Sequence, residues 1–133
     1  MKRIEHIGIA VKDLDAANKT YAAVMGAEPY KSETVETEGV TTSFFKVGES
    51  KIELLAGTRP DSPISKFIEK RGEGIHHMAF YVDDIKTEIE RLKKEGFRLL
   101  NEQPKPGADN KIVAFMHPKD ANGVLVELCQ EKE

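Results

Sequence analysis

The sequence contains a single cysteine, Cys129, among 133 residues, so no disulfide can form within the chain. A chain without disulfides suits a reducing cytoplasm. No apolar run approaches the length of a membrane-spanning helix, and the N-terminus leads into a strand-like segment without the features of a signal peptide. These absences favour a cytoplasmic protein with no membrane partner, in which Cys129 is a buried, inert thiol.

The sequence also lacks a long basic run. Its 20 basic and 23 acidic residues give a net charge of −3, so we do not expect nucleic acid as a partner. The hydrophobic content of 39% and the charged content of 32% are typical of a soluble globular protein. The length corresponds to one domain, or to two small modules that share a core.

What the sequence does contain is an internal repeat. When His77 is aligned with His6, 71 positions earlier, the residues that follow each histidine share a pattern. The second residue after each histidine is small, the third is Ile or Phe, and the fifth is Val. Each half later carries a carboxylate between aliphatic residues, Glu53 in the first and Glu127 in the second, 74 positions apart. The nearly constant offset indicates a duplicated module, in which each copy contributes one histidine and one glutamate.

Side-chain alternation along a strand assigns each histidine to a face with small residues. His6 shares its face with Gly8, and His77 shares its face with Ala79. The opposite faces carry bulky apolar side chains, which we expect to pack against helices. Two imidazoles and two carboxylates that converge on one cavity would form a divalent metal site with open positions for a substrate. The four candidate ligands are His6, Glu53, His77 and Glu127.

Each of these residues also has a structural interpretation. A lone histidine on a strand is more often a hydrogen-bonded structural residue than a ligand, and a lone glutamate between aliphatic residues usually faces solvent. The repeat favours the metal site because both residue types recur at equivalent positions. Two other histidines lack this support. His76 lies on the opposite face from His77, and His117 has no counterpart in the first half, so we expect both to be structural.

The first half of the chain predicts a β-α-β-β-β module over residues 3–57. We expect its helix to be capped by Asp13 or Asp15 and to end before Gly26. Residues 58–73 form a bridge, in which Ser62 as N-cap and Pro63 at the first helical position predict a short helix. The strands of this module are expected at residues 3–11, 29–36, 40–47 and 51–56.

The second half, residues 74–130, repeats the plan. Its helix is expected from Asp84 to Glu95, with Gly96 as C-cap. A loop rich in proline and glycine is expected at residues 104–110. The fold class is therefore α+β, with two paired β-α-β-β-β modules that form a curved eight-stranded mixed sheet. The strands of this module are expected at residues 75–82, 97–101, 111–117 and 123–129.

Three stretches carry a resemblance to a known family. They are the bridge Arg59 to Phe67 that leads to Gly74–Phe80, the segment Phe115 to Lys119 with its His-Pro-Lys sequence, and the closing stretch Gly123 to Leu128. Together with the paired modules, they make the chain similar to the methylmalonyl-CoA epimerase family of the vicinal oxygen chelate superfamily, which has the glyoxalase fold. The likeness covers nearly the whole chain.

This resemblance implies a metal-dependent epimerase that interconverts (R)- and (S)-methylmalonyl-CoA by removing and returning the proton alpha to the thioester. It implies His6, Glu53, His77 and Glu127 as metal ligands, and Glu127 as a catalytic acid–base group. It further implies an acyl-CoA substrate, a homodimer, a role in propionate metabolism and one divalent ion per chain. Cobalt is the first expectation, and manganese, nickel or zinc are also compatible with the ligand set.

Two positions depart from the family. The family often has Gln where this chain has Glu53, and some epimerases place a catalytic Glu three residues after the Gly of a Gly-Val turn, where this chain has Thr42. Inversion needs a base on one face of the carbon and an acid on the other. The group that would act with Glu127 therefore stays open among Glu38, Glu36 and Glu53, although a solvated turn is the simpler interpretation of the first two.

Two alternative functions and one binding question also stay open. A lactoylglutathione lyase shares the fold and a His/Glu metal set, and a metal-free small-ligand-binding protein can share the fold alone. The bridge and the His-Pro-Lys segment argue against the lyase, and the four intact ligand positions argue against the binding protein.

The phosphates of CoA need cations near the site. Lys105, Lys111 and Lys119 lie near predicted loops, but we interpret each as ordinary surface charge.

Overall fold

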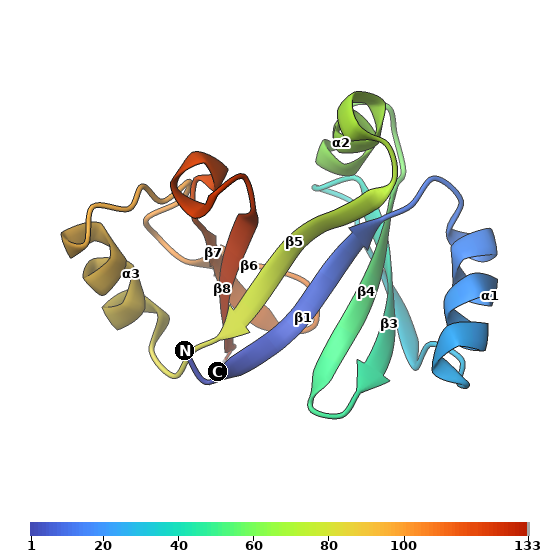
Figure 1. Cartoon of the computed structure of the whole chain (residues 1–133), viewed down its shortest axis with the longest axis horizontal. Helices are drawn as coiled ribbons and strands as arrows, with labels where there is room; N and C mark the ends of the chain where they lie inside the picture. Colours follow the sequence, from blue (N-terminus) through green and yellow to red (C-terminus); the bar gives the residue numbers. More distant parts are fainter. Residues whose placement is uncertain (133) are drawn as a thin grey trace. The chain divides into compact units, whose positions relative to one another are not determined.

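The computed structural model describes residues 1–132, and Figure 1 shows its elements. They are β1 (Arg3–Ala10), α1 (Leu14–Met25), β2 (Lys31–Val35), β3 (Val40–Val47), β4 (Ser50–Gly57), α2 (Pro63–Arg71), β5 (Gly74–Tyr81), α3 (Ile85–Lys94), β6 (Lys105–Pro106), β7 (Lys111–Phe115), the 3-10 helix η1 (Pro118–Ala121) and β8 (Leu125–Glu131). The strand order is β2-β3-β4-β1-β5-β8-β7-β6, with both parallel and antiparallel pairs. The predicted class is confirmed: α+β, with two β-α-β-β-β runs and an eight-stranded mixed sheet.

The chain divides into two compact units. The N-terminal unit is His6–His76, and the C-terminal unit is Met1–Glu5 together with the chain from His77 onward. In the N-terminal unit β1 runs parallel to β4, and β3 pairs antiparallel with both β4 and β2. In the C-terminal unit β5 runs parallel to β8, and β7 pairs antiparallel with both β8 and β6. The two units thus share one pairing plan.

Helix α1 covers one face of the N-terminal unit (Figure 1). Asp13 accepts a hydrogen bond from the backbone N–H three residues later at 3.1 Å, and Gly26 ends the helix in the left-handed conformation. The apolar side of α1 packs on a core that includes Val11, Phe45 and Leu54. A helix therefore covers the bulky apolar face of the first strand, as its alternation predicts.

Helix α2 packs on the opposite face of the same unit. Ser62 accepts a hydrogen bond from the N–H of Ser65 at 3.1 Å, and Pro63 occupies the first helical position, as predicted. Ile64 of this helix packs with Ala10 and Leu55. Ala10 lies on the histidine-bearing face of β1, so α2 closes one end of that face.

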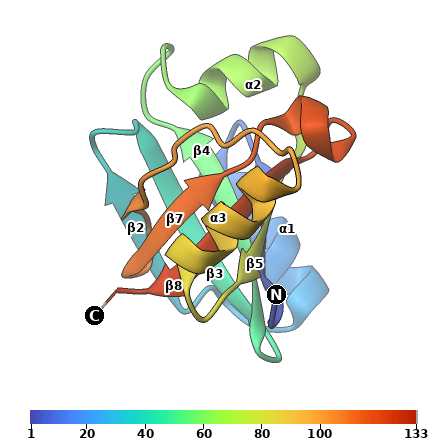
Figure 2. The same ribbon diagram turned by 90° about the vertical axis from the view of Figure 1, so that its left-hand side faces the viewer.

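Helix α3 covers the corresponding apolar face of the C-terminal unit (Figure 2). Ile85 and Ile89 pack with Val82 and Leu128 in one buried core. Gly96 ends the helix as predicted: it follows the capping residue Glu95 with a positive φ of 93°, and its N–H donates to the carbonyl of Lys93 at 3.0 Å. No helix in residues 1–132 has the length and apolarity needed to span a bilayer.

The predicted strand at residues 97–101 is wrong, since only an isolated bridge between Leu99 and Met116 forms there. Beyond this bridge, the side chain of Asn101 makes the hydrogen bonds to β7 that the backbone of a continuing strand would make. Its oxygen accepts from the N–H of Phe115 at 2.9 Å, and its amide donates to the carbonyl of Val113 at 3.1 Å. A side chain thus satisfies the groups on β7 that a neighbouring strand would otherwise pair.

The short strand β6 pairs with β7 at the outer edge of the sheet, where the strand at residues 97–101 was predicted. It lies inside the predicted loop at residues 104–110. It pairs with β7 through a turn in which both Asp109 and Asn110 have positive φ, of 59° and 57°. Two consecutive left-handed residues give a turn with the twist that a two-stranded hairpin needs. Gly107 allows the close approach, because a Cβ there would lie 2.8 Å from a methyl carbon of Val113.

Asp120 of η1 anchors the segment that follows α3. Its carboxylate accepts hydrogen bonds from the Arg98 guanidinium at 2.7 and 3.0 Å and from the Arg98 backbone N–H at 2.8 Å. These bonds lower the pKa of Asp120 to about 2. The folded state therefore binds this proton more weakly than the unfolded state does. The resulting stabilisation is complete above the ordinary aspartate pKa, near 4, and is lost as the pH falls toward 2.

We predict that Asp120→Asn lowers the melting temperature at pH 7, and that the difference from the parent narrows as the pH falls from about 4 toward 2. Thermal unfolding followed by circular dichroism at several pH values measures both effects. Asp83→Asn is the matched control, because Asp83 makes an exposed ion pair with Lys2 at 3.2 Å and should contribute little. Equal melting temperatures for Asp120→Asn and the parent at pH 7 would contradict the prediction.

Candidate metal centre

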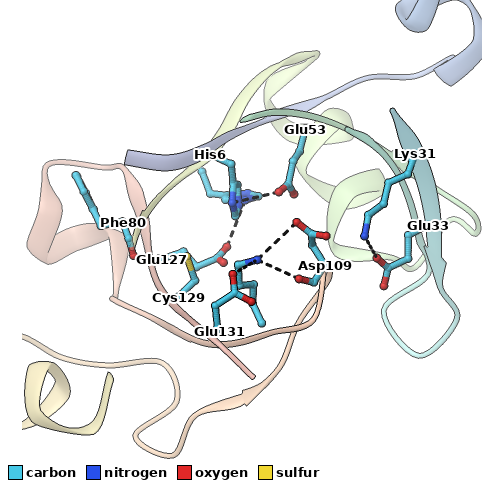
Figure 3. Close-up of polar contacts among 11 residues, drawn as sticks. His6, Lys31, Glu33, Glu53, Phe80, Asp109, Glu127, Cys129 and Glu131 are labelled. Carbon is cyan, nitrogen blue, oxygen red and sulfur yellow. Dashed lines mark hydrogen bonds and ion pairs between the residues drawn. The ribbon is translucent and has the colours of Figure 1, made fainter. Parts of the chain in front are cut away.

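The N-terminal unit brings His6 and Glu53 together on neighbouring parallel strands. In the register of β1 and β4, Glu53 lies opposite Gly8, two residues beyond His6. The absence of a side chain on Gly8 leaves room for both groups on one face of the sheet. The His6 Nδ1 and Glu53 Oε2 atoms are 3.1 Å apart, and both side chains are buried (Figure 3).

The C-terminal unit repeats this construction with His77 and Glu127. In the register of β5 and β8, Glu127 lies opposite Ala79, two residues beyond His77. The His77 Nε2 and Glu127 Oε1 atoms are 3.3 Å apart, and both side chains are buried. The ring of Phe115 approaches the His77 ring edge-on, with centroids 6.4 Å apart. Each unit therefore holds one buried histidine–glutamate pair at the same register.

These pairs have the chemistry of metal ligands. A buried carboxylate needs a positive partner, because an unpaired buried charge is strongly unfavourable. A protonated imidazole or a divalent ion can supply that charge. Two donors bound to one ion at about 2.1 Å and at angles between a right angle and the tetrahedral angle would be about 3.0–3.4 Å apart. The observed separations of 3.1 and 3.3 Å fall in that range.

The other two histidines have structural surroundings, as the sequence predicts. The ring of His76 lies edge-on against Phe67 of α2, with centroids 4.9 Å apart, and burial lowers the pKa of His76. His117 caps η1, because its Nδ1 accepts the N–H of Lys119 at 3.2 Å. Cys129 is fully buried, and its thiol donates to the carbonyl of Phe80 at 3.6 Å.

The interpretation of Lys111 as surface charge is wrong. Its side chain is buried, with Nζ 3.2 Å from a carboxylate oxygen of Glu131 and 3.6 Å from one of Asp109. Figure 3 labels Asp109 and Glu131, which carry these two carboxylates. The backbone carbonyl of Asp109 also accepts a hydrogen bond from Nζ at 3.1 Å. Lys105 and Lys119 are exposed, as predicted.

The candidates for a second acid–base group differ in burial. Glu36 and Glu38 are exposed in the turn between β2 and β3, where Arg59 donates to the carbonyl of Glu36 at 2.8 Å. Thr42 is buried on β3 and lies opposite Glu33 of β2. Lys31 and Glu33 are two residues apart on β2, so they share the face of the sheet on which Thr42 lies.

Comparison with known proteins identifies the family of this chain. Residues 5–115 match the sequence model of the Glyoxalase/Bleomycin resistance protein/Dioxygenase superfamily. The ethylmalonyl-CoA/methylmalonyl-CoA epimerase of Cereibacter sphaeroides is 45% identical over 130 residues, which cover 96% of this chain and 97% of that protein. The mitochondrial methylmalonyl-CoA epimerase of Homo sapiens is 42% identical over 129 residues, which cover 96% of this chain and 73% of that protein.

Solved structures agree with the sequence relatives. A methylmalonyl-CoA epimerase in complex with methylmalonyl-CoA and NH4+ has a TM-score of 0.93 and 39% sequence identity, covering 98% of this chain and 95% of that one. Fold and sequence therefore agree over nearly the full length of the chain, including the four strands that carry the histidine–glutamate pairs. The chain belongs to the methylmalonyl-CoA epimerase family within the Glyoxalase/Bleomycin resistance protein/Dioxygenase superfamily.

Proposed function

We propose that the chain is a metal-dependent epimerase that interconverts (R)- and (S)-methylmalonyl-CoA. The single observation that carries the proposal is the pair of buried histidine–glutamate contacts at equivalent register, one in each unit of an epimerase-family chain. The carbon to be inverted lies between a carboxylate and a thioester. The thioester carbonyl acidifies the proton on this carbon, but the proton is still too weakly acidic for an unaided carboxylate to remove.

The proposed ligands of the ion are His6, Glu53, His77 and Glu127. Two neutral imidazoles and two carboxylates carry a charge of −2, so a divalent ion would neutralise the set and remove the cost of the buried carboxylates. When bound, such an ion would stabilise negative charge that develops on the substrate's oxygens. Cobalt is the first candidate, and manganese, nickel and zinc suit the same donors.

Glu127 is proposed to act on the substrate proton as well. A carboxylate has two oxygens, so one can hold an ion while the other exchanges a proton with the carbon. Burial of Glu127 excludes water from its surroundings, which strengthens its interactions with a charged intermediate. The remaining features of the proposal are an acyl-CoA substrate, a homodimer, a cytoplasmic location, and no nucleic-acid or membrane partner.

The function is tested by incubating purified, metal-loaded protein with one epimer of methylmalonyl-CoA in deuterated water. We expect the opposite epimer to form and solvent deuterium to appear at the central carbon, both followed by chromatography and mass spectrometry. The hemithioacetal of methylglyoxal and glutathione, offered in parallel, should not be converted. Conversion of the hemithioacetal alone would replace the proposal by the lactoylglutathione lyase alternative. Absence of metal and of both reactions would favour a ligand-binding protein.

The ligand assignment is tested by two adjacent substitutions. His77→Ala removes a proposed ligand and should abolish stable metal retention, measured as metal per chain after dialysis. His76→Ala removes the ring contact with Phe67, worth about 1 kcal/mol, and should leave the metal content largely intact. If both variants retain the same amount of metal, the argument from strand alternation is wrong.

The role of Glu127 is tested by Glu127→Gln, which retains an oxygen donor but removes the base. The rate of epimerisation should fall by about 10²–10⁴-fold. Metal affinity, measured by competition with a chelator, should fall by much less. A Glu127→Gln variant that holds metal and still exchanges the substrate proton at the parent rate would exclude Glu127 from the mechanism.

A further inference from the structure

The face of the C-terminal unit that carries His77 and Glu127 continues onto its two outer strands. In the register of β7 and β8, Phe115 lies directly opposite Glu127, and its half-buried ring contacts His77 edge-on. In the register of β6 and β7, Lys105 lies opposite Val113, two residues before Phe115. Directly paired residues share a face, and so do alternate residues on a strand. Lys105 therefore lies on the face that carries the histidine–glutamate pair of this unit.

The Lys105 side chain extends over the ring of Phe115. Its Nζ atom is 5.6 Å from the centre of that ring, within the range of a cation–π interaction. The ring centres of Phe115 and His77 are 6.4 Å apart, and the two distances together place the ammonium group within about 12 Å of the His77 ring. The charge of Lys105 is thus held beside the proposed ligand His77 and within the same unit.

The backbone around Lys105 is restricted. Lys105 lies between Pro104 and Pro106, whose rings fix their own φ angles and confine the residue before each of them to extended backbone. The amide of Asn101 donates a hydrogen bond to the carbonyl of Gln103 at 2.9 Å, which ties this segment to the outer edge of β7. The backbone therefore directs the Lys105 side chain over the sheet, although that side chain is exposed.

The charge of Lys105 is not compensated by a carboxylate. Within residues 1–132, its ammonium group makes no ion pair and no hydrogen bond, and its contact is with the Phe115 ring. Another lysine on this face, Lys111, is already neutralised by Asp109 and Glu131 at 3.6 and 3.2 Å. The ammonium group of Lys105 is thus available to an anionic ligand, whereas that of Lys111 is not.

The N-terminal unit makes the same cation–ring contact but adds a carboxylate. There Phe44 lies opposite Glu53, as Phe115 lies opposite the glutamate of the other unit, and the Nζ atom of Lys31 is 4.9 Å from the centre of the Phe44 ring. Glu33 lies opposite Thr42, two residues before Phe44, and its carboxylate is 3.7 Å from the Lys31 ammonium. The C-terminal unit has Lys105 at the register position that Glu33 takes here, so its outer strand carries a cation in place of an ion pair.

We propose that Lys105 is a substrate-recognition residue, whose ammonium group binds an anionic oxygen group of the acyl-CoA. Two parts of this substrate carry such oxygens, the carboxylate of the acyl group and the phosphates of CoA. A hydrogen bond from an ammonium group to either is charge-assisted and stronger than a neutral one. Lys105 transfers no proton and holds no metal, so it contributes to substrate binding and not to the chemical step. This inference rests on the proposed epimerase function.

The test measures binding without turnover, by isothermal titration calorimetry with two probes. Coenzyme A carries the phosphates without the acyl carboxylate, and methylmalonyl-pantetheine carries the carboxylate without the phosphates. Lys105→Met removes the charge but keeps an apolar chain over Phe115, and it should bind one of the two probes about 10-fold more weakly than the parent. Lys105→Arg should retain most of the affinity. Lys94→Met removes an exposed lysine of α3, on the opposite face of the unit, and should bind both probes as the parent does.

The two probes distinguish the sources of the anionic group. Weaker binding of coenzyme A alone assigns a phosphate to Lys105, and weaker binding of methylmalonyl-pantetheine alone assigns the acyl carboxylate. Parent-like affinity of Lys105→Met for both probes would overturn the inference. An equal loss of affinity in Lys94→Met would also overturn it, because that loss would reflect the change in net charge and not the position of Lys105.

Steady-state epimerisation separates this inference from the proposed function. Lys105→Met should raise KM by about 10-fold and leave kcat close to the parent value, because an interaction made equally in the ground state and the transition state affects binding alone. A lowered kcat with an unchanged KM would contradict the recognition role while the epimerase function stands. A parent that binds coenzyme A but inverts neither epimer would contradict the epimerase function itself.

Discussion

The burial of two carboxylates is the constraint on which the rest of the structure depends. Glu53 and Glu127 are buried on interior strands of the sheet, and an ionised carboxylate in such surroundings is strongly unfavourable without a positive partner. Each has an imidazole nitrogen within 3.3 Å on the adjacent parallel strand. Parallel pairing with a two-residue offset is what brings the groups together. Packing of α1 and α3 against the opposite faces of the two units stabilises the strands that maintain this register.

Both units pair their buried glutamate with a histidine, but they differ at their outer strands. In the N-terminal unit, the five-residue strand β2 carries Lys31 and Glu33 beside the histidine-bearing face. In the C-terminal unit, the outer strand β6 has only two residues, and the side chain of Asn101 takes over part of the pairing with β7. A symmetric duplication would present the same groups twice.

Much of the fold and site could be predicted because the signals are local. The N-caps Asp13, Ser62 and Asp84 each act on a backbone N–H three residues away, so their effect can be identified in a short window of sequence. The assignment of His77, and not His76, to the glutamate-bearing face needed only side-chain alternation. The internal repeat then related the two halves without any structural information.

Three features could not be predicted because they depend on contacts between distant segments. Asn101 stops a strand by bonding to β7, more than ten residues away. Lys111 is buried because the β6–β7 turn and the end of β8 bring Asp109 and Glu131 to its ammonium group. Glu33 shares a face with Glu53 only through the registers of two strand pairs. In each case the decisive partner lies on another element.

The sequence by itself determined which side chains share a face of a strand and which helix ends are capped, because these depend on backbone periodicity and on groups a few residues apart. It also determined which histidines and glutamates recur as pairs, because the repeat can be identified in the sequence alone. The tertiary structure alone decided that each glutamate lies opposite a small residue, Gly8 or Ala79, within reach of its histidine. Strand register depends on how whole strands pair and on how their apolar faces pack, and no single stretch of sequence contains that information.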